Sequence, residues 1–185
     1  MESRTLIINI DETSGSHTVV WYVNGSERRD CVYTFSNSEN AFCGHKIWDV
    51  DYIFSQIKQG IRIAYEQYPD ISETKIKTWN YDYVLMCGDM ELLPCYSYRD
   101  GRIAELDDFG SGVKTKQSTM SQILVDMNHG RLKMVTDILM MPEYFVYRLT
   151  GVKTKQHRNR GQMMHFRFKP EFEAELGREC SVAIG

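Results

Sequence analysis

Residues 9–17 gather side chains that could hold a phosphate, between two apolar runs at 6–8 and 18–23. The stretch contains an amide, two acids, small hydroxyls and a glycine: Asn9, Asp11, Glu12, Thr13, Ser14, Gly15 and Ser16. Backbone N–H groups and hydroxyls of a tight turn can cradle phosphate oxygens. The same residue types also close an ordinary hairpin. The stretch therefore predicts a strand, a polar turn and a strand, with a phosphate role left open for the turn.

The other reactive side chains lack the spacing of a catalytic or metal centre. The five cysteines are far apart and form no CxxC pair, and the five histidines show no metal-ligand spacing. Free, reduced thiols and a cytoplasmic location are therefore expected. Acids such as Asp11, Glu12 and Asp82 could in principle surround two metals, as in nucleases. No catalytic residue and no metal-ligand set is assigned from the residues.

Bulk composition narrows the classes of partner. The chain has 185 residues, 42% of them apolar, and a net charge of −3. Its length suits one domain, taken as residues 1–185. The negative charge argues against a nucleic-acid partner, and the sequence has no apolar run long enough to span a membrane.

Hydrophobic patterning predicts the elements that must position these residues. Strands are expected at 5–11, 17–23 and 29–35, with Asn24-Gly25 as a hairpin turn and a polar loop at 36–47. An amphipathic helix follows Trp48-Asp49 and runs towards Pro69. Further strands are expected at 74–79, 83–86 and 92–98.

The second half is predicted to be more helical. Residues 100–116 read as a loop, and helical patterns cover 120–127, 132–141 and 143–149, the last ended by Gly151. The hexapeptide GVKTKQ occurs at both 112–117 and 151–156, and the stretch 153–167 is rich in basic residues. Both features are typical of solvated surface, and the alternative is a phosphate- or partner-facing surface.

Four segments, in order, resemble the rhamnulokinases of the FGGY carbohydrate kinase family. Residues 9–16 are similar to the family's Asp-x-Gly-Ala-Ser-Ser-Gly-Arg, and 44–50 to its Gly-His-x-x-Trp-Asp-Val. Residues 78–85 look like its Thr-Trp-Gly-Val-Asp-Tyr-x-Leu and lead to a Tyr-Arg-Asp-x-Arg at 98–102. Residues 141–151 resemble Met-Pro-Asp-Tyr-Phe-x-Tyr-x-Leu-Thr-Gly. The match is good over 5–100 and 137–151 and shortened or irregular over 101–136.

The resemblance implies an α/β fold, the N-terminal lobe of a ribonuclease-H-like, actin-like ATPase. Its mixed sheet would open with three antiparallel strands, with helices packed on it. Family members transfer a phosphoryl group from Mg-ATP to a ketose such as L-rhamnulose. Such transfer needs a phosphate-holding turn, a magnesium ion and a carboxylate base. By resemblance, residues 9–16 are the ATP-facing turn. The sugar side is formed by Thr78, Trp79, Asn80, Asp82, Arg99 and Asp100.

The turn departs from the family pattern in ways that disfavour ATP. The family's magnesium-organising Asp is Asn9, its loop Gly is Asp11, the next small residue is Glu12, and its Arg is Ser16. These changes add two carboxylates and remove a cation where a triphosphate would bind. The alternative is that Asp11 binds magnesium itself, from a position shifted relative to the family's aspartate.

The sugar side is altered as well. The family's Asp before Thr-Trp is Lys77, and its substrate-facing Gly is Asn80. Trp79 is explained equally well as a packed core aromatic or as a sugar-stacking group. Arg99 and Asp100, with Arg102, are explained equally well as a buried ion-pair network.

The sequence therefore predicts a truncated, degenerate rhamnulokinase-like lobe, inactive alone, because the family's catalytic-base motif and second lobe are not found in it. A ketose is the expected small-molecule partner, with self-association or pairing with another kinase lobe as further possibilities. The alternatives are a non-catalytic sugar-binding or regulatory module, or one half of a split kinase.

Overall fold

The structure is a computed structural model that describes residues 3–108, 117–154 and 166–184. Its strands are β1 Arg4–Ile10, β2 Ser14–Val23, β3 Ser26–Ser36, β4 Asn40–Phe42, β5 His45–Trp48, β6 Ile71–Lys77, β7 Tyr83–Cys87, β8 Met90–Glu91, β9 Cys95–Tyr96, β10 Asp137–Met140, β11 Phe166–Arg167 and β12 Ser181–Ile184. Its helices are α1 Val50–Gln67, α2 Glu105–Asp108, α3 Thr119–Asn128, α4 Met141–Thr150 and α5 Pro170–Leu176, with short 3₁₀ helices η1 Gly101–Ala104 and η2 Arg131–Met134.

The chain forms two compact units. Unit 1 contains residues 1–38, 51–79 and 142–185, and unit 2 contains residues 39–50 and 80–141. The division of the sequence into well-matched and irregular stretches of one domain stays a prediction.

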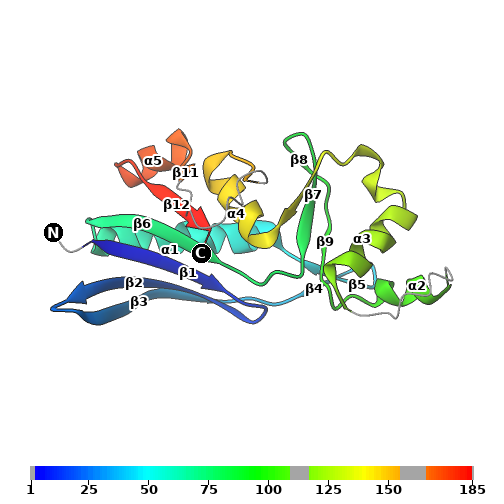
Figure 1. Cartoon of the computed structure of the whole chain (residues 1–185), viewed down its shortest axis with the longest axis horizontal. Helices are drawn as coiled ribbons and strands as arrows, with labels where there is room; N and C mark the ends of the chain where they lie inside the picture. Colours follow the sequence, from blue (N-terminus) through cyan, green and yellow to red (C-terminus); the bar gives the residue numbers. More distant parts are fainter. Residues whose placement is uncertain (1–2, 109–116, 155–165, 185) are drawn as a thin grey trace. The chain divides into compact units, whose positions relative to one another are not determined.

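Unit 1 is built on a six-stranded mixed sheet with the order β11-β12-β6-β1-β2-β3 (Figure 1). β1, β2 and β3 form the predicted antiparallel meander, and β6 pairs in parallel with β1. Asn24 and Gly25 both have positive φ, 50° and 77°, at the β2–β3 turn. This conformation matches the right-handed twist of the two strands and explains why Asn-Gly predicted the hairpin.

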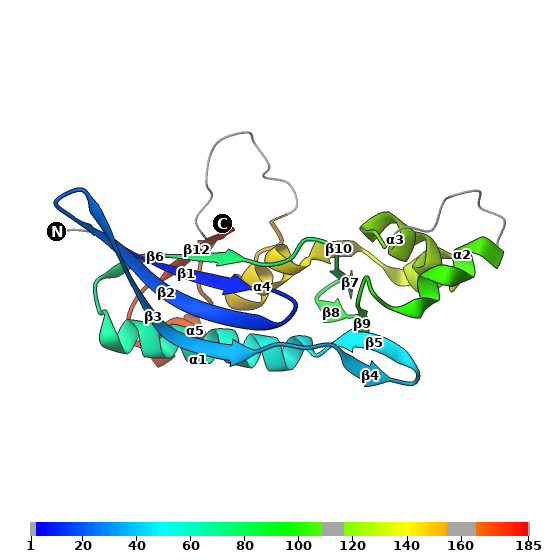
Figure 2. The same ribbon diagram turned by 90° about the horizontal axis from the view of Figure 1, so that it is seen from below.

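Helix α1 packs its apolar stripe into unit 1, as its periodicity predicted. Ile53, Ile57, Ile61 and Ala64 are all at most 1% exposed. Helix α4 lies beside α1 through the Arg148–Asp51 ion pair, and α5 does so through Arg62–Glu175 (Figure 2). Helix α1 therefore contacts both α4 and α5 through ion pairs within unit 1.

Gly60 allows α1 to approach β2 closely. A Cβ atom added to Gly60 would lie 2.4 Å from Nε2 of the buried His17. We therefore expect Gly60→Ala to lower the free energy of unfolding by about 1–3 kcal/mol, despite alanine's better helix propensity. Urea denaturation of this variant and of Gln59→Ala, an exposed neighbour on the same helix, measures the effect. Equal stability of the two variants would contradict this packing role.

Unit 2 contains two three-stranded sheets, β10-β7-β8 and β4-β5-β9. α3 contributes Val125 to a small core with Ile103 of η1 and Leu106 of α2. Ser118 caps α3 by accepting a hydrogen bond from the amide of Ser121 at 3.1 Å. The helix predicted at 120–127 is therefore confirmed.

Four sequence predictions for unit 2 are wrong in detail. The polar loop expected at 36–47 contains the β4–β5 hairpin, closed by Cys43 and Gly44, whose φ angles are 50° and 83°. The helix expected at 132–141 is instead η2 followed by β10, because β10, with the β-branched Ile138, pairs antiparallel with β7. The strand at 92–98 shrinks to β9, and the irregular stretch after Asp100 begins with η1 and α2.

Other sequence features have separate outcomes. Residues 109–116 and 155–165, which hold most of the repeated hexapeptide and of the basic stretch, lie outside the described residues. All five cysteines are described and are free thiols. Within the described ranges, no helix is long and apolar enough to cross a membrane.

Candidate functional site

The turn between β1 and β2 is closed by the side chain of Asp11. Its Oδ1 accepts hydrogen bonds from the backbone amides of Thr13 and Ser14 at 2.7 and 2.8 Å, and from the Thr13 hydroxyl at 2.8 Å. Partial burial would raise the pKa of Asp11, but these hydrogen bonds outweigh it and hold the pKa below its usual value. The carboxylate is thus ionised and holds the two amides that face it.

Asn37 fixes the same turn from the end of β3. Its side-chain amide donates to the Asp11 carbonyl at 2.7 Å, and its backbone amide donates to the Thr13 carbonyl at 2.9 Å. Asn37 is only 4% exposed. A Cβ atom on Gly15 would lie 2.1 Å from the ring of Phe35, so this glycine is required for packing. Neither role was visible in the sequence motif at 9–16, because Phe35 and Asn37 lie 19 and 21 residues beyond its last residue.

The remaining turn residues flank this arrangement. Asn9 and Ser16 are paired across the antiparallel β1–β2 ladder, with Asn9 exposed and Ser16 partly exposed. Glu12 is partly exposed beside Asp11. The structure therefore brings the predicted turn residues together, and their function as a phosphate turn stays a prediction.

The sugar-side residues are divided between the two units. Thr78 and Trp79 belong to unit 1, and Asn80, Asp82, Arg99 and Asp100 belong to unit 2. Trp79 is 7% exposed, which agrees with its interpretation as a packed aromatic.

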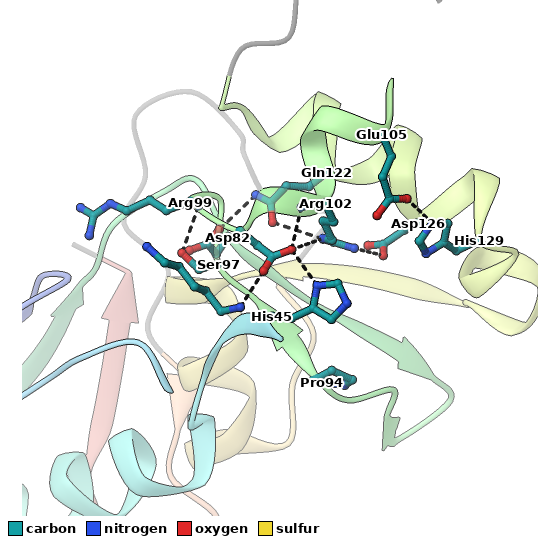
Figure 3. Close-up of polar contacts among 12 residues, drawn as sticks. His45, Asp82, Pro94, Ser97, Arg99, Arg102, Glu105, Gln122, Asp126 and His129 are labelled. Carbon is teal, nitrogen blue, oxygen red and sulfur yellow. Dashed lines mark hydrogen bonds and ion pairs between the residues drawn. The ribbon is translucent and has the colours of Figure 1, made fainter. Parts of the chain in front are cut away.

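Asp82 is buried and bonded through both carboxylate oxygens. Trp48 Nε1 donates to its Oδ2 at 2.6 Å. Gln122 Nε2 donates to its Oδ1 at 3.0 Å (Figure 3). Gln122 also donates to the Tyr81 carbonyl at 3.0 Å. Asp82 therefore ties strand β5, helix α3 and the segment before β7 together.

A second buried carboxylate, Asp126, is surrounded by donors. Arg102 and Arg131 donate to its Oδ1 at 2.5 and 2.8 Å, and Tyr83 donates its hydroxyl to Oδ2 at 2.5 Å. Both guanidinium groups also lie over the ring of Tyr96, at 4.0 and 4.7 Å from its centroid. Burial, together with the Asp126 charge, raises the pKa of Tyr83. The ion-pair interpretation is therefore confirmed for Arg102.

Asp100 links this network to the β4–β5 hairpin. Its carboxylate accepts from the amide of Lys46 at 2.6 Å and from the amide of Arg102 at 3.0 Å, and it lies 3.1 Å from Nδ1 of His45 (Figure 3). Burial would raise the pKa of Asp100, but these donors outweigh it and lower the pKa. The first residue of the Asp-x-Arg motif thus caps η1 rather than projecting into solvent.

Arg99 lies in a more open cluster with two tyrosines. Its guanidinium lies 5.0 Å from the ring centroid of Tyr98, and its Nε donates to the Tyr98 hydroxyl at 2.9 Å. Tyr98 stacks obliquely on Tyr81, with ring centroids 4.9 Å apart. Tyr81 is 51% exposed, and Asn80 beside it is exposed. Among the predicted sugar-side residues, Asn80 and Arg99 therefore lie beside exposed aromatic surface.

The residues present do not fit a bound Mg-ATP at the β1–β2 turn. The two amides that would face a phosphate are already bonded to Asp11, and the neighbouring Glu12 adds a second carboxylate. Within residues 3–108, 117–154 and 166–184, no group of three or more His, Cys, Asp or Glu side chains could hold a metal ion.

Comparison with solved structures defines the class of fold. The whole chain superposes on 48% of a gluconate kinase from Lactobacillus acidophilus with a TM-score of 0.74 and 12% identity. It also superposes on 48% of a carbohydrate kinase from Novosphingobium aromaticivorans with a TM-score of 0.72 and 12% identity. The chain has the α/β fold of the ribonuclease-H-like, actin-like sugar kinases, as predicted.

Sequence comparison narrows this class to one kind of kinase. The chain is 31% identical to a rhamnulokinase of Oceanobacillus iheyensis in an alignment that covers 86% of this chain and 37% of that protein. It is 30% identical to a rhamnulokinase of Mannheimia succiniciproducens over 69% of this chain and 30% of that protein. No protein-family model matches. The chain is therefore rhamnulokinase-like, of the FGGY carbohydrate kinase type, and spans about a third of the length of these relatives.

Proposed function

We propose that the chain is a ketose-binding part of a rhamnulokinase-like lobe and does not transfer phosphate by itself. The observation that carries the binding proposal is the cluster of Tyr81, Tyr98 and Arg99, with Asn80 next to it. Aromatic faces pack against the C–H faces of sugars, and amide and guanidinium groups hydrogen-bond to sugar hydroxyls. The curated relatives are named rhamnulokinases, which favours L-rhamnulose as the ligand.

The buried hydrogen bonds of Asp82 and Asp100 fix the segments that carry the Tyr81–Tyr98–Arg99 cluster. Gln122 holds both the Tyr81 carbonyl and Asp82, and Asp100 is fixed by the amides of Lys46 and Arg102. Rigid supporting contacts of this kind hold a binding surface in one geometry. Asp82 and Asp100 therefore act as positioning residues, and Tyr81 and Arg99 contact the sugar.

The proposal of inactivity rests on the turn. Phosphoryl transfer needs donors and a metal that stabilise the transferred phosphate, and the Asp11 carboxylate occupies the turn amides. Mg-ATP is thus expected to serve the kinases that this chain resembles, and we propose that this chain does not bind it. A cytoplasmic location fits the free thiols of the chain.

Thermal shift with L-rhamnulose tests the binding proposal. A ligand that binds only the folded chain raises its melting temperature. We expect L-rhamnulose to raise the melting temperature of the wild-type chain and of Tyr22→Ala, and to leave that of Tyr81→Ala unchanged. Tyr22 is a matched control because it is 54% exposed on β2 of unit 1, against 51% for Tyr81. Equal shifts in the two variants would remove Tyr81 from the site.

A non-catalytic regulatory module and half of a split kinase remain the alternatives. The exposed tyrosine of this cluster and the adjacent Arg99 favour a sugar-binding role over a regulatory module that contacts only protein. Half of a split kinase would keep the same sugar side, so ketose binding agrees with that alternative as well. Tyrosine and arginine also anchor protein–protein interfaces, so the deciding observation is the ligand response: the melting temperature of a lobe that contacts only another polypeptide would not respond to a ketose.

A further inference from the structure

The β1–β2 turn contains an anion-binding arrangement that is already filled. The amides of Thr13 and Ser14 converge on one oxygen of Asp11, and the Thr13 hydroxyl joins them. The Ser14 hydroxyl lies 3.3 and 3.4 Å from the two oxygens of the same carboxylate. Successive backbone N–H groups that converge in this way form a concavity suited to anions, phosphate among them. Here the anion is a side chain of the protein.

Contacts from β3 and from the residue after it hold the β1–β2 turn in this conformation. Asn37, which is buried, holds the Asp11 carbonyl and the Thr13 carbonyl at the same time. Phe35 fills the space beside Gly15, so the start of β2 has no room to shift towards it. A phosphate that entered would have to displace the carboxylate from its donors while meeting its negative charge.

We propose that Asp11 is an internal anion that closes the β1–β2 turn of this kinase fold to nucleotide phosphates. Phosphate is excluded because the Asp11 carboxylate already accepts hydrogen bonds from the turn amides, and repulsion by its negative charge is not the whole cause. This inference deepens the inactivity part of the proposed function and rests on it, but it does not depend on ketose binding, because the Tyr81 cluster belongs to the other unit. Failure of one proposal can therefore be distinguished from failure of the other.

Two variants separate occupancy from charge. Asp11→Ala removes the acceptor, whereas Asp11→Asn removes the charge and keeps an Oδ1 that can accept the same amides. The backbone tolerates both, because Asp11 is not among the described residues with positive φ. The probe is inorganic tripolyphosphate, titrated while the Thr13 and Ser14 amide signals are followed by ¹H–¹⁵N NMR.

The expected result is a saturable shift of both amide signals in Asp11→Ala and none in the wild-type chain. We expect the affinity of Asp11→Asn for tripolyphosphate to be at least about tenfold weaker than that of Asp11→Ala. Equal affinity of the two variants for tripolyphosphate would show that the charge of Asp11, and not its occupation of the amides, excludes phosphate, and would overturn the proposal. Binding by the wild-type chain, or no binding by Asp11→Ala, would overturn the closure itself.

A measurement on the wild-type chain keeps the proposal falsifiable even if the alanine variant does not fold. Scalar coupling across a hydrogen bond links an amide nitrogen to the carbon that carries the acceptor oxygen. We expect such couplings from the Thr13 and Ser14 nitrogens to the Asp11 side-chain carboxyl carbon. Their absence, with the Asn37 side-chain coupling to the Asp11 carbonyl carbon present as an internal control, would overturn the proposal.

Discussion

Replacing Asp126 with alanine is expected to lower the free energy of unfolding by about 3–5 kcal/mol, the largest effect of any single change considered for this chain. The carboxylate is fully buried and accepts from Arg102 and Arg131 through one oxygen and from Tyr83 through the other. Its removal takes away the nearest carboxylate of the buried Arg102 guanidinium, which then keeps Asp100 at 4.0 Å and the Gln122 side-chain oxygen at 3.5 Å. Urea denaturation followed by circular dichroism, together with amide exchange of strand β7, measures the loss.

Two further variants show where this effect originates. Asp126→Asn keeps the oxygen that faces the two arginines but loses the charge and the acceptor for Tyr83, so its stability should fall between wild type and Asp126→Ala. Asp89→Ala removes an exposed acid of the same unit and should cost no more than about 0.5 kcal/mol. A loss below about 1 kcal/mol for Asp126→Ala would contradict a central role for the network.

Acidification should destabilise the chain through His17, which gives the second large effect. This ring is fully buried, its Nε2 lies 3.2 Å from the Ile57 carbonyl, and its Nδ1 has no hydrogen-bond partner among the described residues. Burial lowers the pKa of His17 from 6.5 to about 4, and the contact with the Ile57 carbonyl offsets only part of this shift. The folded chain therefore resists a proton that the unfolded chain accepts.

The sign of the pH effect follows directly. Above pH 6.5 the ring is neutral in both states and its contribution to stability is fully present. As the pH falls from 6.5 to about 4, the unfolded state binds the proton first, and the free energy of unfolding falls by roughly 3 kcal/mol. Below about 4 both states are protonated and His17 causes no further loss.

Comparison with His17→Gln isolates this contribution from the other titrating groups. Glutamine can still donate to the Ile57 carbonyl but does not titrate. Urea denaturation between pH 4 and 6.5 should therefore show a steeper loss of stability with falling pH for wild type than for this variant. Parallel pH dependences for the two chains would show that His17 does not carry the acid sensitivity.

Local signals explain which elements could be predicted from the sequence. The β2–β3 hairpin was predictable because Asn24-Gly25 lies between alternating strands, and α1 because Ile53, Ile57 and Ile61 repeat on one helical face. Strand β10 could not be predicted in this way, because its partner β7 lies more than fifty residues earlier in the sequence. The pairing of the two strands overrides the helical periodicity of residues 132–141. Cys43 also hid a hairpin turn, since cysteine rarely marks a positive φ.

The candidate site shows the same division. The motif at 9–16 predicted a polar hairpin turn and flagged the acids in it, but not that Asp11 would take the amides of Thr13 and Ser14. The motif at 78–82 identified Asp82, whereas its partner Gln122 lies forty residues away and belongs to no quoted motif. Tyr81, which stands where the family has valine, became a candidate only when the structure placed it against Tyr98.

Calorimetric titration of the intact wild-type chain, first with L-rhamnulose and then with Mg-ATP, tests most directly the claim that the sugar side is retained and the phosphate turn is closed. We predict a saturable heat of binding for the ketose and none for the nucleotide. Saturable binding of Mg-ATP would contradict the closed turn. The absence of any heat with L-rhamnulose would contradict the sugar-binding function.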